Sequence, residues 1–220
     1  MISDLRPGAV PLALLGIGTG IALLLFFSLR PKTQLSLAVA GVIVFFAVVS
    51  QPAAQQRIIP ALESAAKTHA GHVFTVGHSY RLLDDGFYFS PAPAASSGLT
   101  LTAGEAARYV IRAGVSFLAV PAPWQLAATR ELVYLPEQLV WYVMIVLLPF
   151  GLVAAWRRDP GAAALFAGFT LPTAAALALT NGNVGTLLRL RGIVIPYLLW
   201  LGAVGFCAAL QRLAARTSES

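Results

Sequence analysis

Residues 138–156, QLVWYVMIVLLPFGLVAAW, form a run of 19 residues that contains no charged side chain. A helix needs about 17–25 mostly apolar residues to cross the hydrocarbon core of a bilayer. This run has that length, and it lies between Glu137 and Arg157. The stretch therefore predicts a membrane-spanning helix and places the chain among integral membrane proteins.

The composition of the whole chain agrees with this class. Of 220 residues, 58% are hydrophobic and only 11% are charged, whereas ordinary globular domains have about 25% charged residues. The net charge of +6 comes mostly from arginines beside apolar runs, so it indicates membrane insertion and no nucleic-acid partner. Cys207 is the only cysteine, which excludes a disulfide or a cysteine metal site within one chain.

Five apolar runs in the sequence are near the length of a membrane span. They cover residues 9–29, 35–50, 138–156, 161–180 and 193–211. We therefore expect an all-α integral membrane protein with about five transmembrane helices and a small extracytoplasmic subdomain. Three parts are predicted: a transmembrane hairpin over 1–50, the subdomain over 51–137, and a three-span membrane region over 138–220.

The basic residues in short loops predict the orientation, because cytoplasmic loops carry an excess of lysine and arginine. Three basic clusters flank the spans: Arg30 with Lys32, Arg157 with Arg158, and Arg212 with Arg216. Five spans put all three clusters on one side, which we take as the cytoplasm together with the C-terminus. The N-terminus, the segment 51–137 and the loop 181–192 then lie outside.

Two pairs of small residues predict close packing of membrane helices. Gly16 and Gly20 have GxxxG spacing, and Ala164 and Gly168 form a second small-xxx-small pair. Such spacing lets helix backbones approach closely. Glycine and alanine are also common in membrane helices, so chance spacing is the alternative.

The segment 51–137 is the only part of the chain long enough for a water-facing subdomain. Residues 79–90 predict a β-hairpin, in which Asp84, Asp85 and Gly86 make the tight turn. The same two aspartates are also candidates for paired acids in general acid–base chemistry, although the turn is the simpler interpretation.

Thr102 and Glu105 form a capping box, which predicts a helix that continues to about Leu118. Glu105, Arg108 and Arg112 fall on one flank of this helix. Its apolar area comes from Val110, Val115, Phe117 and Leu118. The pattern favours an amphipathic helix that lies along the membrane interface.

The loop 181–192 is polar, glycine-rich and doubly cationic between two predicted spans. Arg189 and Arg191 are candidates for binding a phosphate or another anion, because a guanidinium group forms paired hydrogen bonds with such groups. The alternative is that they extend toward lipid headgroups. Asn183 is a candidate ligand contact, and the alternative is turn chemistry.

Glu137 is a further candidate site residue, because a carboxylate beside the bilayer indicates function by default. The histidines His69, His72 and His78 lack the spacing of a zinc motif. We therefore predict no metal site and no cofactor. The catalytic residues, if the chain is an enzyme, are left open.

Two stretches carry a family resemblance. They are FLAVPAPW at 117–124, followed by Glu137 and Trp141, and GNVGT at 182–186, which runs into the two arginines. They resemble C-terminal portions of multi-span glycosyltransferases and oligosaccharide-repeat polymerases of bacterial surface-polysaccharide assembly. The resemblance covers about the last half of the chain. Those glycosyltransferases carry acidic residues in an early external loop, whereas this chain has only Asp4 before residue 63.

The resemblance implies a bacterial inner (plasma) membrane protein of cell-envelope glycan assembly. A polyprenyl-phosphate-linked or other anionic substrate would bind at the outer leaflet, and the chemistry of an enzyme of this kind would be glycosyl transfer. The residues assigned to the anion are Arg189, Arg191, Asn183, Glu137, Arg108 and Arg112. The alternative is a non-enzymatic accessory subunit of a larger membrane complex, which has the lipid bilayer and other membrane subunits as partners.

Overall fold

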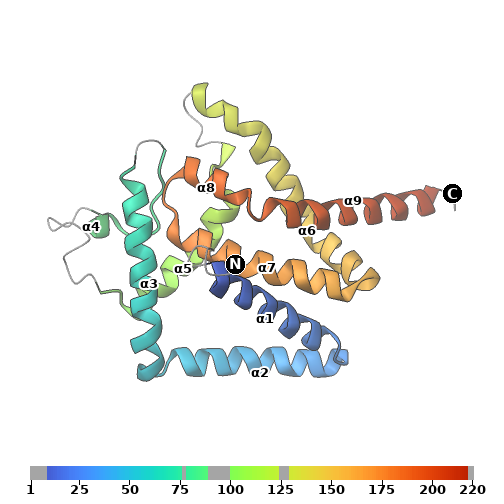
Figure 1. Ribbon diagram of the computed structural model, residues 1–220, viewed down its shortest axis with the longest axis horizontal. Helices are drawn as coiled ribbons and strands as arrows, with labels where there is room; N and C mark the ends of the chain where they lie inside the picture. The colour runs from blue at the N-terminus through green and yellow to red at the C-terminus, as the bar shows by residue number, and fades with distance from the viewer. Residues whose placement is uncertain (1–8, 76–77, 89–99, 124–128, 218–220) are drawn as a thin grey trace. The chain divides into compact units, whose positions relative to one another are not determined.

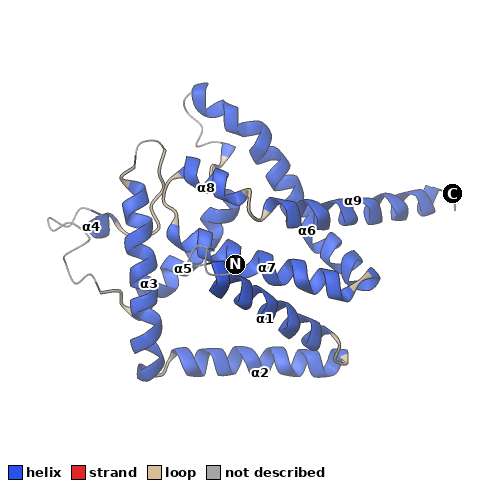
Figure 2. Cartoon of the chain, viewed as in Figure 1, coloured by secondary structure: helices blue, strands red, loops and turns tan. Residues whose placement is uncertain are grey.

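The computed structural model describes residues 9–75, 78–88, 100–123 and 129–217. Within these ranges every regular element is a helix, and the only extended pairing is an isolated bridge between Ser79 and Asn183 (Figure 2). Five of the helices are long and apolar enough to cross a membrane. The protein is thus an all-α, multi-pass membrane protein, as its sequence predicts.

The five candidate spanning helices overlap the five predicted runs, and α9 continues past its predicted end at residue 211 to Thr217 (Figure 1). They are α1 (Ala9–Phe27), α2 (Pro31–Val49), α6 (Leu135–Arg158), α7 (Pro160–Thr180) and α9 (Ile195–Thr217). α2 starts four residues before its apolar run because Pro31 occupies its first turn, where a missing N–H has no helical partner to lose. Most large apolar side chains on these helices are exposed in the chain itself, as lipid contact requires.

The chain divides into two compact units. Unit 1 comprises Met1–Phe26, Pro121–Ala174 and Arg191–Ser220, and it contains α1, α6, α9 and most of α7. Unit 2 comprises Phe27–Val120 and Ala175–Leu190. It contains α2, α3 (Pro52–Val73), α4 (Asp85–Tyr88), α5 (Ala103–Ala119) and most of α8 (Val184–Arg191).

Small residues bring the helices of unit 1 into backbone contact. A Cβ on Gly168 would lie 2.5 Å from the carbonyl oxygen of Gly16 and 2.6 Å from the nitrogen of Gly20. A Cβ on Gly20 would lie 2.9 Å from the carbonyl oxygen of Ala164. The two small-residue pairs therefore pack against each other, which confirms the close approach that their spacing predicts.

A second close approach in unit 1 joins α6 and α9. A Cβ on Gly205 would lie 2.7 Å from both the nitrogen of Gly151 and the carbonyl oxygen of Leu147. Ala155 of α6 and Leu201 of α9 are buried in one apolar cluster near this contact, and Ala163 of α7 belongs to the same cluster. Gly151 and Gly205 are outside the small-residue pairs that the sequence pattern indicated.

The predicted β-hairpin over 79–90 is wrong for the residues that the structure describes. Asp85–Tyr88 forms the short helix α4 in place of a returning strand, and residues 89–90 lie outside the described ranges. The Tyr88 hydroxyl accepts hydrogen bonds from the backbone N–H groups of Leu82 and Leu83 at 3.0 and 3.2 Å. One side chain thus satisfies two buried donors that a hairpin partner would otherwise have to satisfy.

The predicted helix after Thr102 is present as α5, and its capping box is complete. The Thr102 hydroxyl accepts from the N–H of Glu105, and the Glu105 carboxylate accepts from the N–H of Thr102 at 2.8 Å. One face of α5 is buried in unit 2 through Ala106, Tyr109, Ala113 and Phe117. Phe117, which we expected on the membrane-facing side, is therefore a core residue, whereas Val110, Val115 and Leu118 are exposed.

The segment 181–192, expected as a loop, contains the helix α8. The Asn183 side chain begins it, because its Oδ1 accepts a hydrogen bond from the N–H of Thr186 at 3.1 Å. The residues Val184, Leu187 and Leu188 are buried at helical spacing. This apolar face stabilises a helix in a stretch whose glycines and arginines look irregular in sequence.

Candidate anion-binding pocket

A pocket of about 260 Å³ in unit 2 contains two of the predicted anion-binding arginines. One wall is α5, which contributes Glu105, Arg108 and Arg112. The other wall comes from residues 82–87, which lead into and form part of α4, and from residues 100–101, which precede α5. Its lining residues are Leu82, Leu83, Asp84, Gly86, Phe87, Thr100 and Leu101.

Helix geometry places the two arginines on the pocket side of α5. Arg108 and Arg112 are four residues apart, so they lie one turn apart on one face. The capping box fixes where this helix starts and therefore which residues face the pocket. The side-chain and backbone hydrogen bonds from Thr102, with a smaller contribution from the charge of Arg108, lower the pKa of Glu105. Glu105 is therefore ionised at neutral pH, and its position at the helix start suits a negative charge.

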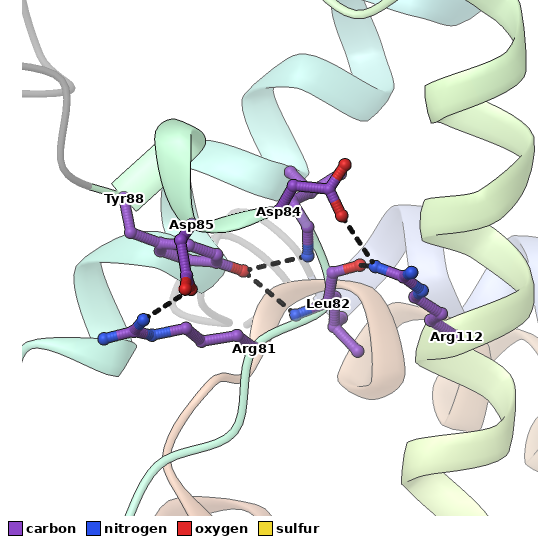
Figure 3. A network of polar contacts seen from close by, with 7 residues as sticks. Arg81, Leu82, Asp84, Asp85, Tyr88 and Arg112 are labelled. Atoms are coloured by element: carbon purple, nitrogen blue, oxygen red, sulfur yellow. Dashed lines mark hydrogen bonds and ion pairs between the residues drawn. The ribbon is translucent and has the colours of Figure 1, made fainter.

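The opposite wall is held by a small polar network around Tyr88 (Figure 3). The Arg81 guanidinium forms an ion pair with Asp85 at 2.6 Å, and its central carbon lies 5.5 Å from the centre of the Tyr88 ring. Burial raises the pKa of Tyr88, and the N–H groups of Leu83 and Leu82 oppose that shift. Tyr88 is thus a neutral hydroxyl that fixes the backbone of the pocket wall.

Arg112 connects the two walls. Its guanidinium donates to the carbonyl oxygen of Leu82 at 3.2 Å and lies 3.4 Å from Asp84 Oδ1 (Figure 3). Both side chains of the ion pair are substantially exposed, so the pair itself contributes little stability. The guanidinium therefore remains open to solvent.

The residues that precede α5 are held to α3 by one partly buried hydrogen bond. The Glu63 carboxylate accepts a hydrogen bond from the N–H of Leu101 at 2.7 Å. Leu101 is buried and lines the pocket. The lining therefore comes from residues 82–87 and 100–112, and α3 holds the second stretch in place through Glu63.

The other predicted site residues have different surroundings. Asn183 donates from its side-chain nitrogen to the Thr75 hydroxyl at 3.0 Å and caps the start of α8, and its contact with a ligand stays a prediction. Arg189 and Glu137 are exposed. Arg189 and Arg191 are two residues apart on α8, and such positions do not face the same side of a helix.

Arg191 is buried, with 1% of its surface exposed. Its guanidinium donates to the side-chain oxygen of Gln138 at 3.1 Å and lies 4.5 Å from the centre of the Trp141 ring. Gln138 and Trp141 are buried as well. The contacts give Arg191 a packing role inside unit 1, and its role in anion binding stays a prediction.

Unit 2 has a buried aromatic cluster around His69, and the sequence pattern did not indicate this cluster. The ring of His69 is fully buried among Tyr80, Tyr88 and Tyr109, with ring centres 5.5–6.3 Å apart. Burial lowers the pKa of His69 to about 4, although its hydrogen bond to the Asn181 carbonyl opposes this shift. Among the described residues, no three His, Cys, Asp or Glu side chains come together as a metal-binding group.

The sequence had no signal for this cluster or for the role of Tyr88. The tyrosines are spread over three segments, and Tyr109 donates to the carbonyl oxygen of Leu179 across 70 residues of chain. Only the three-dimensional arrangement shows that these residues support the pocket wall from behind.

No protein-family model, curated protein or solved structure matches this chain.

Proposed function

We propose that this chain is a cell-envelope membrane protein that binds a phosphate-bearing lipid, such as a polyprenyl-phosphate-linked sugar, in the α5 pocket. The observation that carries the proposal is that Arg108 and Arg112 line one pocket of about 260 Å³. Both arginines belong to the predicted extracytoplasmic segment. The proposal concerns binding, and it assigns no bond-making step to any residue.

The chemistry of the pocket suits a phosphate. Two guanidinium groups one helical turn apart present several N–H donors to one anion, and arginine matches phosphate oxygens in pairs. Asp84 is the present partner of Arg112 at 3.4 Å. A phosphate presents several acceptor oxygens to the two guanidinium groups, so we expect it to displace Asp84 from Arg112.

The surface beside the pocket suits a ligand with an apolar tail. Ile111 and Val115 on α5 are 66% and 60% exposed, and they are one turn apart on a strip next to the arginines. Arginines beside an exposed apolar strip are the pattern of a helix at the membrane interface. A lipid would place its tail toward this strip and its phosphate between Arg108 and Arg112.

The charge distribution around the spans supports the outer leaflet as the location. The three basic clusters near the span ends share one side if all five helices cross the membrane. The segment with α3, α4 and α5 then lies on the other side, outside the cytoplasm. Together with the resemblance in sequence, this favours a role in handling lipid-linked sugars in a bacterial inner membrane.

A role as an accessory subunit of a larger membrane complex is the second candidate. One observation favours it: none of the residues of α2 is buried by the rest of this chain. α2 is thus available to lipid or to helices of other subunits. The phosphate pocket is compatible with both roles, because a subunit can present the lipid to a partner enzyme.

Lipid binding is the direct test. The purified protein in nanodiscs would be titrated with polyprenyl phosphate and with polyprenol, which lacks the anion. We expect a clear preference for the phosphate, and we expect Arg108→Gln with Arg112→Gln to remove it. Arg112→Lys should recover only part of the affinity, because lysine keeps the charge and loses the paired geometry.

Arg57→Gln is the matched control, since Arg57 is exposed on α3 and does not line the pocket. Equal binding of the two lipids, or full binding by the double variant, would refute the proposal.

The side of the membrane on which the pocket lies has a separate test. A Gly86→Cys variant without Cys207 should react with an impermeant thiol reagent added outside the cell, and labelling only from the cytoplasm would reverse the orientation.

A further inference from the structure

An open groove of about 530 Å³ lies between α6 and α9 in unit 1, and it shares no lining residue with the α5 pocket. Its apolar lining is Pro149, Phe150, Val153, Ala208, Ala209 and Leu213. Among the side chains that the structure describes, Arg212 is the charged one that lines it. The lining and the size of the groove suit an apolar chain with an anionic end.

The groove follows from how the two helices pack. They approach most closely where the backbone of Gly205 meets Gly151, and Figure 1 shows them crossing and then separating toward their C-terminal ends. Ala208 and Ala209 are too small to fill the space opposite Phe150 and Val153. In a bilayer this space must be filled by something apolar, because an empty groove forfeits its packing contacts.

The positive charge at one end of the groove favours an occupant that has an anionic headgroup as well as an apolar chain. Arg212 belongs to the last turns of the α9 span, which reaches Ala214. Arg157 is four residues beyond Val153, so it extends the same face of α6 by one turn. Arg212 lines the groove, and helical spacing puts Arg157 on the Val153 face of α6. Both arginines belong to the predicted cytoplasmic ends of their helices, where arginine can meet a headgroup.

We propose that this groove is a binding site for an anionic phospholipid. One acyl chain lies along Phe150, Val153 and Ala209, and the headgroup phosphate contacts Arg157 and Arg212. Basic pockets between transmembrane helices on the cytoplasmic side are suited to anionic lipid headgroups. The site is independent of the α5 pocket in its residues, its unit and its predicted side of the membrane.

The test measures which lipids stay bound after detergent extraction. Micelles would contain equal amounts of phosphatidylglycerol and phosphatidylcholine, and native mass spectrometry would count the lipids on each protein. Wild-type protein should retain phosphatidylglycerol preferentially. Each of Arg157→Gln and Arg212→Gln should lower this preference by about fivefold. Arg158→Gln is the control, because the next position on a helix points to a different face.

A second variant separates lipid binding from protein folding. Ala209→Phe fills the groove and should displace both lipids, whereas Ala203→Phe on the exposed part of the same helix should leave them bound. Equal retention of the two lipids by wild-type protein would overturn the site. So would a preference that survives the loss of both arginines. A dimer that Ala209→Phe abolishes, with no retained lipid, would assign the groove to a second copy of the chain.

Discussion

The Nδ1 atom of His69 lies 2.7 Å from the backbone carbonyl oxygen of Asn181. The hydroxyl of Tyr80 donates to the same carbonyl at 2.6 Å. Because a carbonyl only accepts hydrogen bonds, Nδ1 must carry the proton. The Nε2 atom is buried without a hydrogen-bond partner, so the neutral ring fits this position, which joins α3 to the end of α7.

Acid should therefore destabilise unit 2. Burial lowers the pKa of His69 to about 4 from its ordinary value of 6.5, so the unfolded chain takes up this proton first as the pH falls. The stabilising contribution is complete above the unfolded pKa and is lost between about pH 6.5 and pH 4. The difference amounts to about 3 kcal/mol. Thermal unfolding of the detergent-solubilised protein across this range should show a falling midpoint.

His69→Gln tests the assignment, since glutamine can still donate to the Asn181 carbonyl but does not titrate. We expect this variant to have a flatter pH dependence than wild-type protein. His78→Gln is the comparison, because His78 is exposed. If His69→Gln and wild-type protein lose stability in parallel, another group is responsible for the acid sensitivity.

Gly182→Ala should destabilise the same contact by about 1–3 kcal/mol. A Cβ at this position would lie 2.5 Å from the carbonyl oxygen of His69 and 2.6 Å from Cγ2 of Val73. The backbone of α3 would have to move away, and the hydrogen bonds of His69 and Tyr80 to Asn181 would weaken. Chemical denaturation followed by tyrosine fluorescence or circular dichroism would measure the change.

Gly71→Ala is the matched control for this substitution. Gly71 lies in α3 close to the same contact, but a Cβ there meets nothing within 4 Å. Alanine in a helix interior is favoured over glycine by about 0.5–1 kcal/mol, so Gly71→Ala should stabilise the protein slightly. The opposite signs of the two changes are the expected result, and equal signs would contradict the packing described here.

Local sequence signals were enough for the membrane helices and for α5. A span is defined by its own 20 or so apolar residues, and the capping box depends on Thr102 and Glu105 alone. The spacing of four residues between Arg108 and Arg112 is also a local signal. It predicted that they share one face of α5, and both line one pocket in the structure. The predictions that the structure confirms rest on strong local signals, namely a long apolar run or a complete capping box.

Long-range contacts decided the parts that the sequence did not reveal. The sequence Asp84-Asp85-Gly86 suits a hairpin turn, yet the Tyr88 hydroxyl and the buried Leu82 favour a short helix. The contact of His69 with Asn181 spans 112 residues. No local pattern distinguishes the exposed Arg189 from the buried Arg191, because the face that α8 buries is set by its surroundings.

Gly205→Ala should test the membrane packing of unit 1. The new methyl group would lie 2.7 Å from the nitrogen of Gly151 and from the carbonyl oxygen of Leu147. We expect a loss of about 1–3 kcal/mol, measured by unfolding in a denaturing detergent. Gly18→Ala in α1 is the control, since a Cβ there has no neighbour within 4 Å. Equal stability of the two variants would mean that α6 and α9 do not approach as closely as described.

Tyr88→Phe should affect both stability and ligand binding, because it acts on the pocket wall. The substitution keeps the ring and removes the acceptor of two buried N–H groups, those of Leu82 and Leu83. An unsatisfied buried donor costs about 1–3 kcal/mol, and both residues line the pocket. We expect a lower unfolding midpoint and weaker binding of polyprenyl phosphate. Tyr197→Phe removes a hydroxyl in unit 1 and should change neither. A Tyr88→Phe protein with wild-type stability and altered binding would instead place the hydroxyl in direct contact with the ligand.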